Sequence, residues 1–181
     1  MANYARVARR IRVPLGFVFA ALYLWFARPT WASIAAGSAI AASGVWLRAL
    51  ASGHVKKNEE LTTTGPYAHT RNPLYLGSIL IGLGFALASL SVVVALLLVL
   101  LFVLIYVPVV RSEEAYLSNR FPGFAEYAAK VPRFGWRFTT EGHGKAAFSG
   151  ELYRKHREYN ALIGAVLMVA ALVAKMLLFP R

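Results

Sequence analysis

Long apolar runs alternate with short polar blocks along this chain of 181 residues. A helix that crosses a bilayer needs about 20 predominantly apolar residues, and about five runs approach that length. They lie at roughly residues 11–27, 31–50, 74–90, 91–110 and 161–179. The pattern predicts an all-α integral membrane protein, a single membrane-embedded domain with five transmembrane helices. Since almost nothing separates the third run from the fourth, these two are expected to form a tight helical hairpin.

Composition narrows the class further. The chain is 58% hydrophobic, which exceeds what a soluble domain of this size needs. The predicted spans use most of its residues and leave no room for a separate soluble domain. It contains no cysteine, so disulfides, thiolate metal sites and a cysteine nucleophile are excluded. The four histidines are scattered without ligand spacing, and no metal site is expected.

The distribution of basic residues predicts the orientation. The chain has 20 Lys and Arg and a net charge of +12. With the N-terminus in the cytoplasm, the basic residues gather inside, except for Arg28, Lys175 and Arg181. The inside set comprises Arg6, Arg9, Arg10 and Arg12, the loop 48–73 and the stretch 111–159. The charge is then explained by orientation and by attraction to anionic membrane lipids, and no nucleic-acid partner is expected.

Two polar blocks border these apolar runs. The first runs from Gly65 to Gly77 and reads GPYAHTRNPLYLG. The second begins at the pair Glu113-Glu114 and ends at Arg133. Charged side chains at a membrane boundary are costly, so they suggest a site. Both blocks fall on the cytoplasmic side, so we expect them to meet there.

The order of these motifs resembles the isoprenylcysteine carboxyl methyltransferase family, which includes related phospholipid methyltransferases. The motifs are Gly-Pro-Tyr, Arg-Asn-Pro-x-Tyr-x-Gly, Glu-Glu and Tyr-x-x-x-Val-Pro-Arg, within about residues 61–134. The resemblance implies S-adenosylmethionine-dependent methyl transfer, with the cofactor pocket at the cytoplasmic face and a lipid or prenylated substrate arriving from the bilayer. Two positions depart from the family. Asn72 replaces the usual His, and residues 121–124 read Phe-Pro-Gly-Phe instead of Phe-Gly-x-x-Tyr.

The resemblance and the chemistry of the cofactor assign roles to particular residues. The expected cofactor-binding residues are Gly65, Pro66, Tyr67, His69, Asn72, Pro73, Glu113 and Glu114. The expected substrate-binding residues are Arg71, Tyr127 and Arg133, and the expected catalytic residues are Arg71, Tyr75 and Glu114. Arg71 is chosen because its planar fork matches a carboxylate or phosphate. Asn72 can form hydrogen bonds but cannot titrate near neutral pH, so its expected role is structural.

The methyl acceptor stays open. A prenylcysteine carboxylate is a nucleophile at pH 7 and needs only desolvation and alignment. A phosphatidylethanolamine amine must first lose a proton, and Glu114 or the Tyr75 phenol would have to accept it. The resemblance favours the carboxylate. The oligomeric state is not indicated.

Other interpretations are possible. A nicotinamide-dependent sterol or enone reductase would need several donors for a diphosphate, whereas this chain offers Glu113-Glu114. A non-catalytic scaffold would bind no cofactor. The glutamate pair alone is compatible with a solvated helix end, Arg71 with a headgroup anchor, and Trp136 with an aromatic belt. Residues 151–159 read as a basic helix on the membrane surface, and we expect it to border the substrate entrance.

Overall fold

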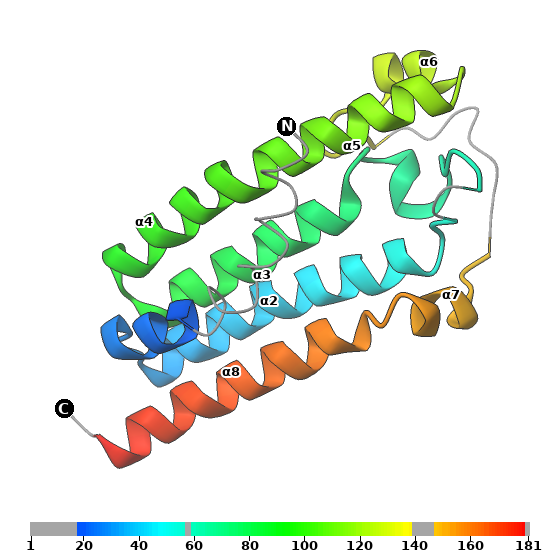
Figure 1. Cartoon of the computed structure of the whole chain (residues 1–181). Coiled ribbons are helices and arrows are strands. Elements are labelled where there is room, and N and C mark those ends of the chain that lie inside the picture. Colours follow the sequence, from blue (N-terminus) through cyan, green and yellow to red (C-terminus); the bar gives the residue numbers. More distant parts are fainter. Residues whose placement is uncertain (1–17, 57–58, 139–146, 180–181) are drawn as a thin grey trace.

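The computed structural model of the chain describes residues 18–56, 59–138 and 147–179. Within these residues all regular elements are helical. The long ones lie side by side in a bundle: α2 (Trp31–Ser52), α3 (Pro73–Ser89), α4 (Val92–Leu101) with α5 (Val107–Arg120), and α8 (Tyr159–Leu178) (Figure 1). The short elements η1 (Gly65–Ala68), α6 (Phe124–Lys130) and α7 (Gly150–Lys155) gather at one end of that bundle. The turn between α3 and α4 and the last residues of α8 lie at the opposite end.

Within the described part of the chain, three helices are long and apolar enough to cross a membrane: Trp31–Ser52, Val92–Arg120 and Tyr159–Leu178. The first and third agree with the predicted runs 31–50 and 161–179. Helix α3 is equally apolar but has 17 residues, slightly below the usual length of a span. Most of the predicted first span, 11–27, lies outside the described residues, as do Arg6, Arg9, Arg10 and Arg12. The count of five spans and the orientation therefore stay predictions.

The helix after the hairpin is longer than expected. The predicted span was 91–110, but the helix continues to Arg120 and comprises 29 residues. It includes η2, a π-helical turn from Phe102 to Tyr106. Pro108 explains this turn, because proline has no N–H to donate to the carbonyl four residues earlier and its ring crowds that carbonyl. The N–H of Val107 bonds instead to the carbonyl of Phe102, five residues back. The glutamate pair thus lies on a continuous helix.

Helices α2 and α3 make the closest contact of the bundle. A Cβ added to Gly44 would lie 2.5 Å from the carbonyl oxygen of Gly77, and one added to Gly84 would lie 2.4 Å from that of Gly37. A Cβ cannot be accommodated at these distances, so both positions require glycine. Small residues at helix contacts are typical of membrane proteins, because they let the backbones approach closely. The small-residue surface on α2 therefore positions the first polar block, because Asn72 caps the start of α3.

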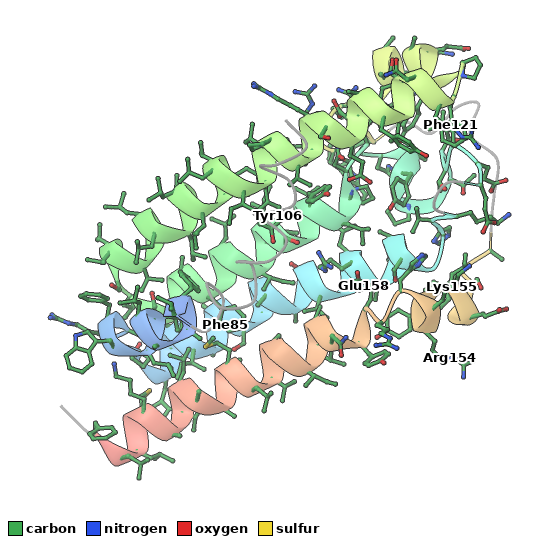
Figure 2. The ribbon with its side chains drawn as sticks, in the orientation of Figure 1. Phe85, Tyr106, Phe121, Arg154, Lys155 and Glu158 are labelled. Carbon is green, nitrogen blue, oxygen red and sulfur yellow. The ribbon has the colours of Figure 1, made fainter. Side chains whose placement is uncertain are left out.

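The segment 151–159 does not form one helix. Helix α7 ends at Lys155, and α8 begins at Tyr159. Between them Arg157 adopts a positive φ of 54°, a conformation that costs a non-glycine residue energy and interrupts the helix. Arg154 and Lys155 point away from the bundle, as expected for a surface segment (Figure 2). The expected glycine-containing connector before this segment, at about residues 141–144, lies outside the described residues.

The C-terminal end of α8 is hydrogen-bonded to the end of the helix that precedes α2. Residues 18–26 are helical, and the ammonium group of Lys175 donates hydrogen bonds to the carbonyls of Leu24, Trp25 and Ala27. These are carbonyls at the end of that helix, where a cation is favoured. The contact holds α8 close to residues 18–26.

Candidate active site

A cavity of about 360 Å³ opens at the end of the bundle where the short helices gather. Its walls come from α2, α3, η2, α5, α6 and the beginning of α8, together with the loop between α2 and α3. Eight predicted site residues line it: Tyr67, Arg71, Asn72, Pro73, Tyr75, Glu113, Glu114 and Tyr127. The two polar blocks therefore meet around one space, as the sequence predicted.

Glu114 is the centre of this meeting. Its side chain is buried, and Oε1 accepts a hydrogen bond of 3.0 Å from Nδ2 of Asn72. Oε2 accepts from Arg133, at 2.9 Å from Nε and 2.7 Å from Nη2. The hydrogen bond that Arg133 donates to the Glu114 carboxylate raises the pKa of the guanidinium. Both carboxylate oxygens are thus engaged, and Glu114 links α5 to the start of α3 and to the segment after α6.

Arg71 has a buried donor without a partner. Its backbone N–H donates to the carbonyl of Pro132 at 2.9 Å, which ties the first block to the second. Its Nε lies 3.7 Å from Oε1 of Glu114, which is an ion pair but beyond hydrogen-bonding distance. Among the described residues this buried Nε makes no hydrogen bond. A buried unsatisfied donor costs about 1–3 kcal/mol, which makes Arg71 a candidate ligand-binding residue.

Glu113 faces the cavity with fewer protein partners than its neighbour. The Tyr75 phenol donates a hydrogen bond of 2.8 Å to Oε2 of Glu113. The ring of Tyr75 meets that of Tyr106 edge-on, with centroids 5.7 Å apart. A carboxylate offers about four acceptor positions, so Glu113 retains capacity for a cationic or hydroxyl ligand group.

Tyr67 and Tyr127 join η1 to α6. The Tyr127 phenol donates a hydrogen bond of 2.7 Å to the carbonyl oxygen of Tyr67. Burial raises the pKa of both phenols, and in Tyr127 the charge of Arg71 offsets part of that rise. Both phenols are therefore neutral at physiological pH, and Tyr127 serves as a donor that fixes the cavity wall.

Within the described part of the chain, the cavity lining does not include four of the predicted site residues: Gly65, Pro66, His69 and Arg133. Gly65 has a φ of +58°, and a Cβ there would meet the ring of His54 at 2.5 Å, so it shapes the loop. Pro66 is buried at the start of η1. Arg133 contacts the site through its guanidinium on Glu114 and through its carbonyl, which accepts from Asn72. The cofactor-binding role of Gly65, Pro66 and His69 stays a prediction.

His69 holds the segment that follows α6. Its Nδ1 lies 2.6 Å from the carbonyl oxygen of Arg137, and its own carbonyl accepts from the Arg137 N–H at 2.9 Å. The His69 ring stacks on Trp136, with centroids 4.5 Å apart and an interplanar angle of 5°. Trp136 therefore packs on this histidine, in addition to any contact that it makes at the membrane interface.

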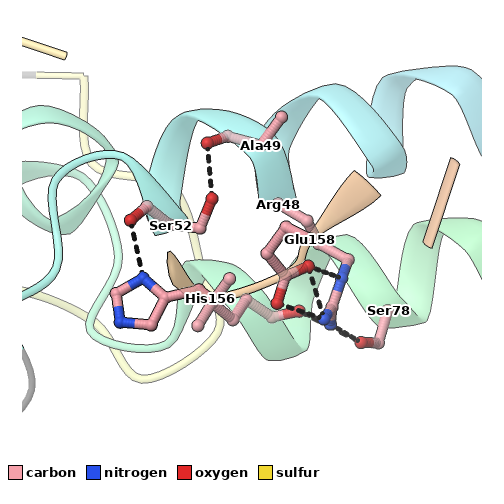
Figure 3. Close-up of polar contacts among 7 residues, drawn as sticks. Arg48, Ala49, Ser52, Ser78, His156 and Glu158 are labelled. Atoms are coloured by element: carbon pink, nitrogen blue, oxygen red, sulfur yellow. Dashed lines mark hydrogen bonds and ion pairs between the residues drawn. The ribbon is translucent and has the colours of Figure 1, made fainter. Parts of the chain in front are cut away.

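The sequence interpretation did not single out several other cavity residues, among them Arg48, Ser78, Tyr106 and Glu158. Arg48 and Glu158 form an ion pair of 2.8 Å (Figure 3). A signal for Arg48 was available, because an arginine inside an apolar run is a candidate functional residue. Ser78 and Tyr106 gave no such signal within their helices.

A bundle of membrane-length helices with a cavity of ligand size at one end is the architecture of an integral membrane protein with a candidate binding site. The family described as phospholipid methyltransferase matches residues 15–123, which is more than half of the chain. The chain belongs to this family, and the expected family resemblance is confirmed. The family is described as one of methyltransferases, and membership in it does not specify isoprenylcysteine as the acceptor.

Two curated relatives are similar over part of their length. The cobalt-zinc-cadmium resistance protein CzcN of Cupriavidus metallidurans is 38% identical over 132 residues, which are 68% of this chain and 60% of that protein. The nickel-cobalt-cadmium resistance protein NccN of Alcaligenes xylosoxydans xylosoxydans is 42% identical over 79 residues, 44% of this chain and 37% of that protein. The chain thus spans less than two thirds of either relative. No solved structure matches it. Among the described residues, no three or more histidine or carboxylate side chains are grouped as metal ligands.

Proposed function

We propose that this protein is an S-adenosylmethionine-dependent methyltransferase that methylates a membrane-associated acceptor at the cytoplasmic end of the helical bundle. The observation that carries the proposal is the convergence of Asn72, Arg71 and Arg133 on Glu114. The cavity at this convergence has an available acceptor in Glu113 and a buried donor in Arg71 that makes no hydrogen bond. Family membership supports methyl transfer over the reductase and scaffold alternatives.

The cavity residues suit the charges of the cofactor. S-adenosylmethionine carries an ammonium group, a carboxylate, ribose hydroxyls and a sulfonium, and when bound it supplies an electrophilic methyl group. Glu113 has acceptor capacity for the ammonium or ribose, and the wall from Tyr67 to Pro73 borders the same space. The rings of Tyr67 and Tyr75 can face a sulfonium, a cation–π contact worth about 0.5–2 kcal/mol.

Glu114 and Arg71 then have different roles. Glu114 is engaged by two guanidinium groups and an amide, so it holds the site together and has little capacity left to accept a proton. Arg71 keeps one buried donor for the anionic group of the acceptor. Substrate alignment is the main requirement of such an in-line transfer.

These contacts favour a carboxylate acceptor, such as a prenylcysteine, over an amine. An amine requires a base, yet both oxygens of Glu114 are occupied and the Tyr75 phenol already donates to Glu113. A carboxylate requires none, and its charge suits the guanidinium of Arg71. The alternative is N-methylation of a phospholipid such as phosphatidylethanolamine, with Glu113 as the proton acceptor.

Calorimetry on the detergent-solubilised protein tests the cofactor. We expect S-adenosylhomocysteine to bind and NADPH not to bind. Glu113→Gln should weaken S-adenosylhomocysteine by about tenfold, the size of a lost charge-assisted hydrogen bond. Glu126→Gln, on the exposed side of α6, is the matched control and should bind normally. Binding of NADPH alone would overturn the proposal.

A radiolabelled methyl donor tests the acceptor. Label should enter a prenylcysteine analogue faster than phosphatidylethanolamine, and carboxyl labelling should be released by mild base as methanol. Labelling of the amine alone would replace the carboxylate proposal by its alternative while leaving the methyltransferase assignment intact.

A second candidate role comes from the relatives, which are named for resistance to cobalt, zinc, cadmium or nickel. We propose that methyl transfer by this chain contributes to such tolerance. The test is growth on these metals of a host lacking the protein and complemented with wild type or Glu114→Gln. If both restore tolerance equally, methyl transfer is not the cause.

A further inference from the structure

A chain of polar contacts crosses the bundle along the wall of the candidate active site. It joins four helices, which Figure 1 shows in the order α5, α3, α2 and α8. Its members all line the cavity: Glu113 on α5, Leu74, Tyr75 and Ser78 on α3, Arg48 on α2, and Glu158 at the start of α8. The proposed function uses the α5 and α3 end of this chain and assigns no role to Arg48 and Glu158.

Arg48 makes its hydrogen bonds to three other residues of the protein. Nε donates to Oε2 of Glu158 at 3.0 Å, and Nη2 donates to both carboxylate oxygens at 2.9 and 2.8 Å. Nη1 donates to the Leu74 carbonyl at 3.0 Å and to Oγ of Ser78 at 2.6 Å (Figure 3). Every nitrogen of this guanidinium therefore has an acceptor within the protein, in contrast to Nε of Arg71.

Through these bonds Arg48 holds the first turn of α3. The Leu74 carbonyl accepts from Nη1 of Arg48 and also from the Ser78 hydroxyl, at 3.1 Å. Leu74 directly precedes Tyr75, whose phenol donates to Oε2 of Glu113 at 2.8 Å. A shift of this turn would move the phenol relative to Glu113, so the orientation of the Glu113 carboxylate depends on the contacts that hold the turn.

The surrounding structure accommodates the Arg48–Glu158 pair at some cost. The stem of Arg48 lies against α3 at Gly77, where an added Cβ would be 2.6 Å from Cγ of the arginine. Arg157, directly before Glu158, has a positive φ of 54°, which is unfavourable for a non-glycine residue. The side chains of the pair are only 21% and 13% exposed, and a buried ion pair adds little net stability over apolar residues of similar volume. The geometry that the pair imposes on the site explains it better than stability does.

We propose that Arg48 is a positioning residue for cofactor binding. Held by Glu158, it fixes the first turn of α3, and through that turn it fixes the Tyr75 phenol that orients Glu113. Glu113 then presents its remaining acceptor positions to the ammonium or ribose of S-adenosylmethionine. The inference rests on the proposed function and adds residues that act on the cofactor without touching it. It predicts that the effect of Arg48 on cofactor affinity depends on the Tyr75 hydroxyl.

A double-mutant cycle, measured by calorimetry with S-adenosylhomocysteine, tests this dependence. Arg48 and Glu158 are both changed to methionine, so that no single buried charge remains. In the chain that keeps Tyr75, we expect this change to weaken binding about tenfold, the size of one charge-assisted hydrogen bond. Tyr75→Phe should weaken binding by a similar factor. In the Tyr75→Phe chain the two methionines should weaken binding by less than about twofold more, because the hydroxyl that Arg48 positions is already absent.

Arg48→Lys provides a second cycle. A lysine keeps the charge beside Glu158, but it has no planar fork to bond both Glu158 and the Leu74 carbonyl. We expect binding about threefold weaker than in wild type, and this difference should also disappear in the Tyr75→Phe chain. Thermal unfolding shows whether each variant is folded, and Arg48→Lys carries the test if the methionine variant is not.

The exposed pair Glu126–Lys130 on α6, changed to glutamines, is the matched control and should bind S-adenosylhomocysteine as wild type does. Two outcomes overturn the inference and leave the cofactor proposal standing. One is wild-type affinity in the Arg48 variants or in Tyr75→Phe. The other is an equal loss of affinity with and without the Tyr75 hydroxyl, because Arg48 would then act only on the fold. A wild-type chain that binds no S-adenosylhomocysteine overturns the cofactor proposal and this inference with it.

Discussion

The side-chain amide of Asn72 donates a hydrogen bond to Oε1 of Glu114 across 3.0 Å, and both side chains are buried. The same amide donates to the carbonyl of Arg133 at 3.2 Å. The related family has a histidine at this position, and the structure shows that an asparagine there forms hydrogen bonds to both polar blocks. An amide does not titrate, so Asn72 itself remains a hydrogen-bond donor at any physiological pH.

Removing that amide should weaken the site. Asn72→Ala removes the amide donor to Oε1 of Glu114 and one of the two donors to the Arg133 carbonyl, which Thr70 also bonds. We expect a loss of about 1–3 kcal/mol in the free energy of unfolding. Chemical unfolding of the solubilised protein followed by circular dichroism measures this. Asn119→Ala, on the exposed surface of α5, is the control. Equal stability of the two variants would contradict the structural role.

Neutralising Glu114 should affect stability and binding together. Glu114→Gln leaves Arg71 and Arg133 without their shared carboxylate. Because Arg133 is partly exposed, the expected loss is about 1–3 kcal/mol, less than for a fully buried pair. S-adenosylhomocysteine affinity should fall in parallel, whereas Glu113→Gln should lower affinity at nearly unchanged stability. Thermal unfolding and calorimetry on the same preparations separate the two glutamates.

The buried phenols predict a stability that declines in alkaline solution. Burial raises the pKa of Tyr67 and Tyr127 in the folded chain, whereas in the unfolded chain the phenols titrate near their ordinary value of 10.0. Above that pH the unfolded chain releases protons that the folded chain retains, so the free energy of unfolding falls as pH rises. Unfolding measured between about pH 8 and pH 11 should show this decline.

Tyr127→Phe should flatten that decline, because it removes one of the titrating groups. Tyr159→Phe, a more exposed tyrosine, is the control and should keep the wild-type slope. If Tyr127→Phe retains the full slope, burial of this phenol does not cause it.

The contact between α2 and α3 should not tolerate a side chain. Gly44→Val would place a Cβ 2.5 Å from the Gly77 carbonyl oxygen, so the helices must separate. We expect a loss of about 1–3 kcal/mol in the free energy of unfolding, as for other overpacked contacts. Gly150→Ala meets nothing within 4 Å and should be neutral. An equally stable Gly44→Val variant would show that this contact is loose.

The orientation can be read from single cysteines, since the natural chain has none. Lys155→Cys lies at the polar end of the bundle and Phe179→Cys at the opposite end, and both positions are exposed. A membrane-impermeant maleimide added to intact cells should label position 179 and not position 155, and inverted vesicles should show the reverse. The opposite pattern would place the cavity outside the cytoplasm.

Much of the architecture could be predicted from the apolar runs. The bounds of α2 and α8 lie within a few residues of the predicted spans, because each run is long enough to satisfy its own backbone only as a helix. The length of the helix through Glu113 was underestimated. Its polar half has no apolar periodicity, and only its continuity with the hairpin makes it helical.

The sequence by itself determined that this chain is helical and suited to a membrane, and that two charged blocks fall at one end. Run lengths and charge positions are local properties, so they can be read without coordinates. Only the tertiary structure decided which charges pair. Arg48 and Glu158 are 110 residues apart, and their ion pair depends on the packing of α8 against α2 and on the absence of a side chain at Gly77. The folded structure also decided that Arg71 has an N–H group without a hydrogen bond, whereas Arg48 does not. The number of acceptors near each guanidinium depends on how the helices pack, and the sequence does not state it.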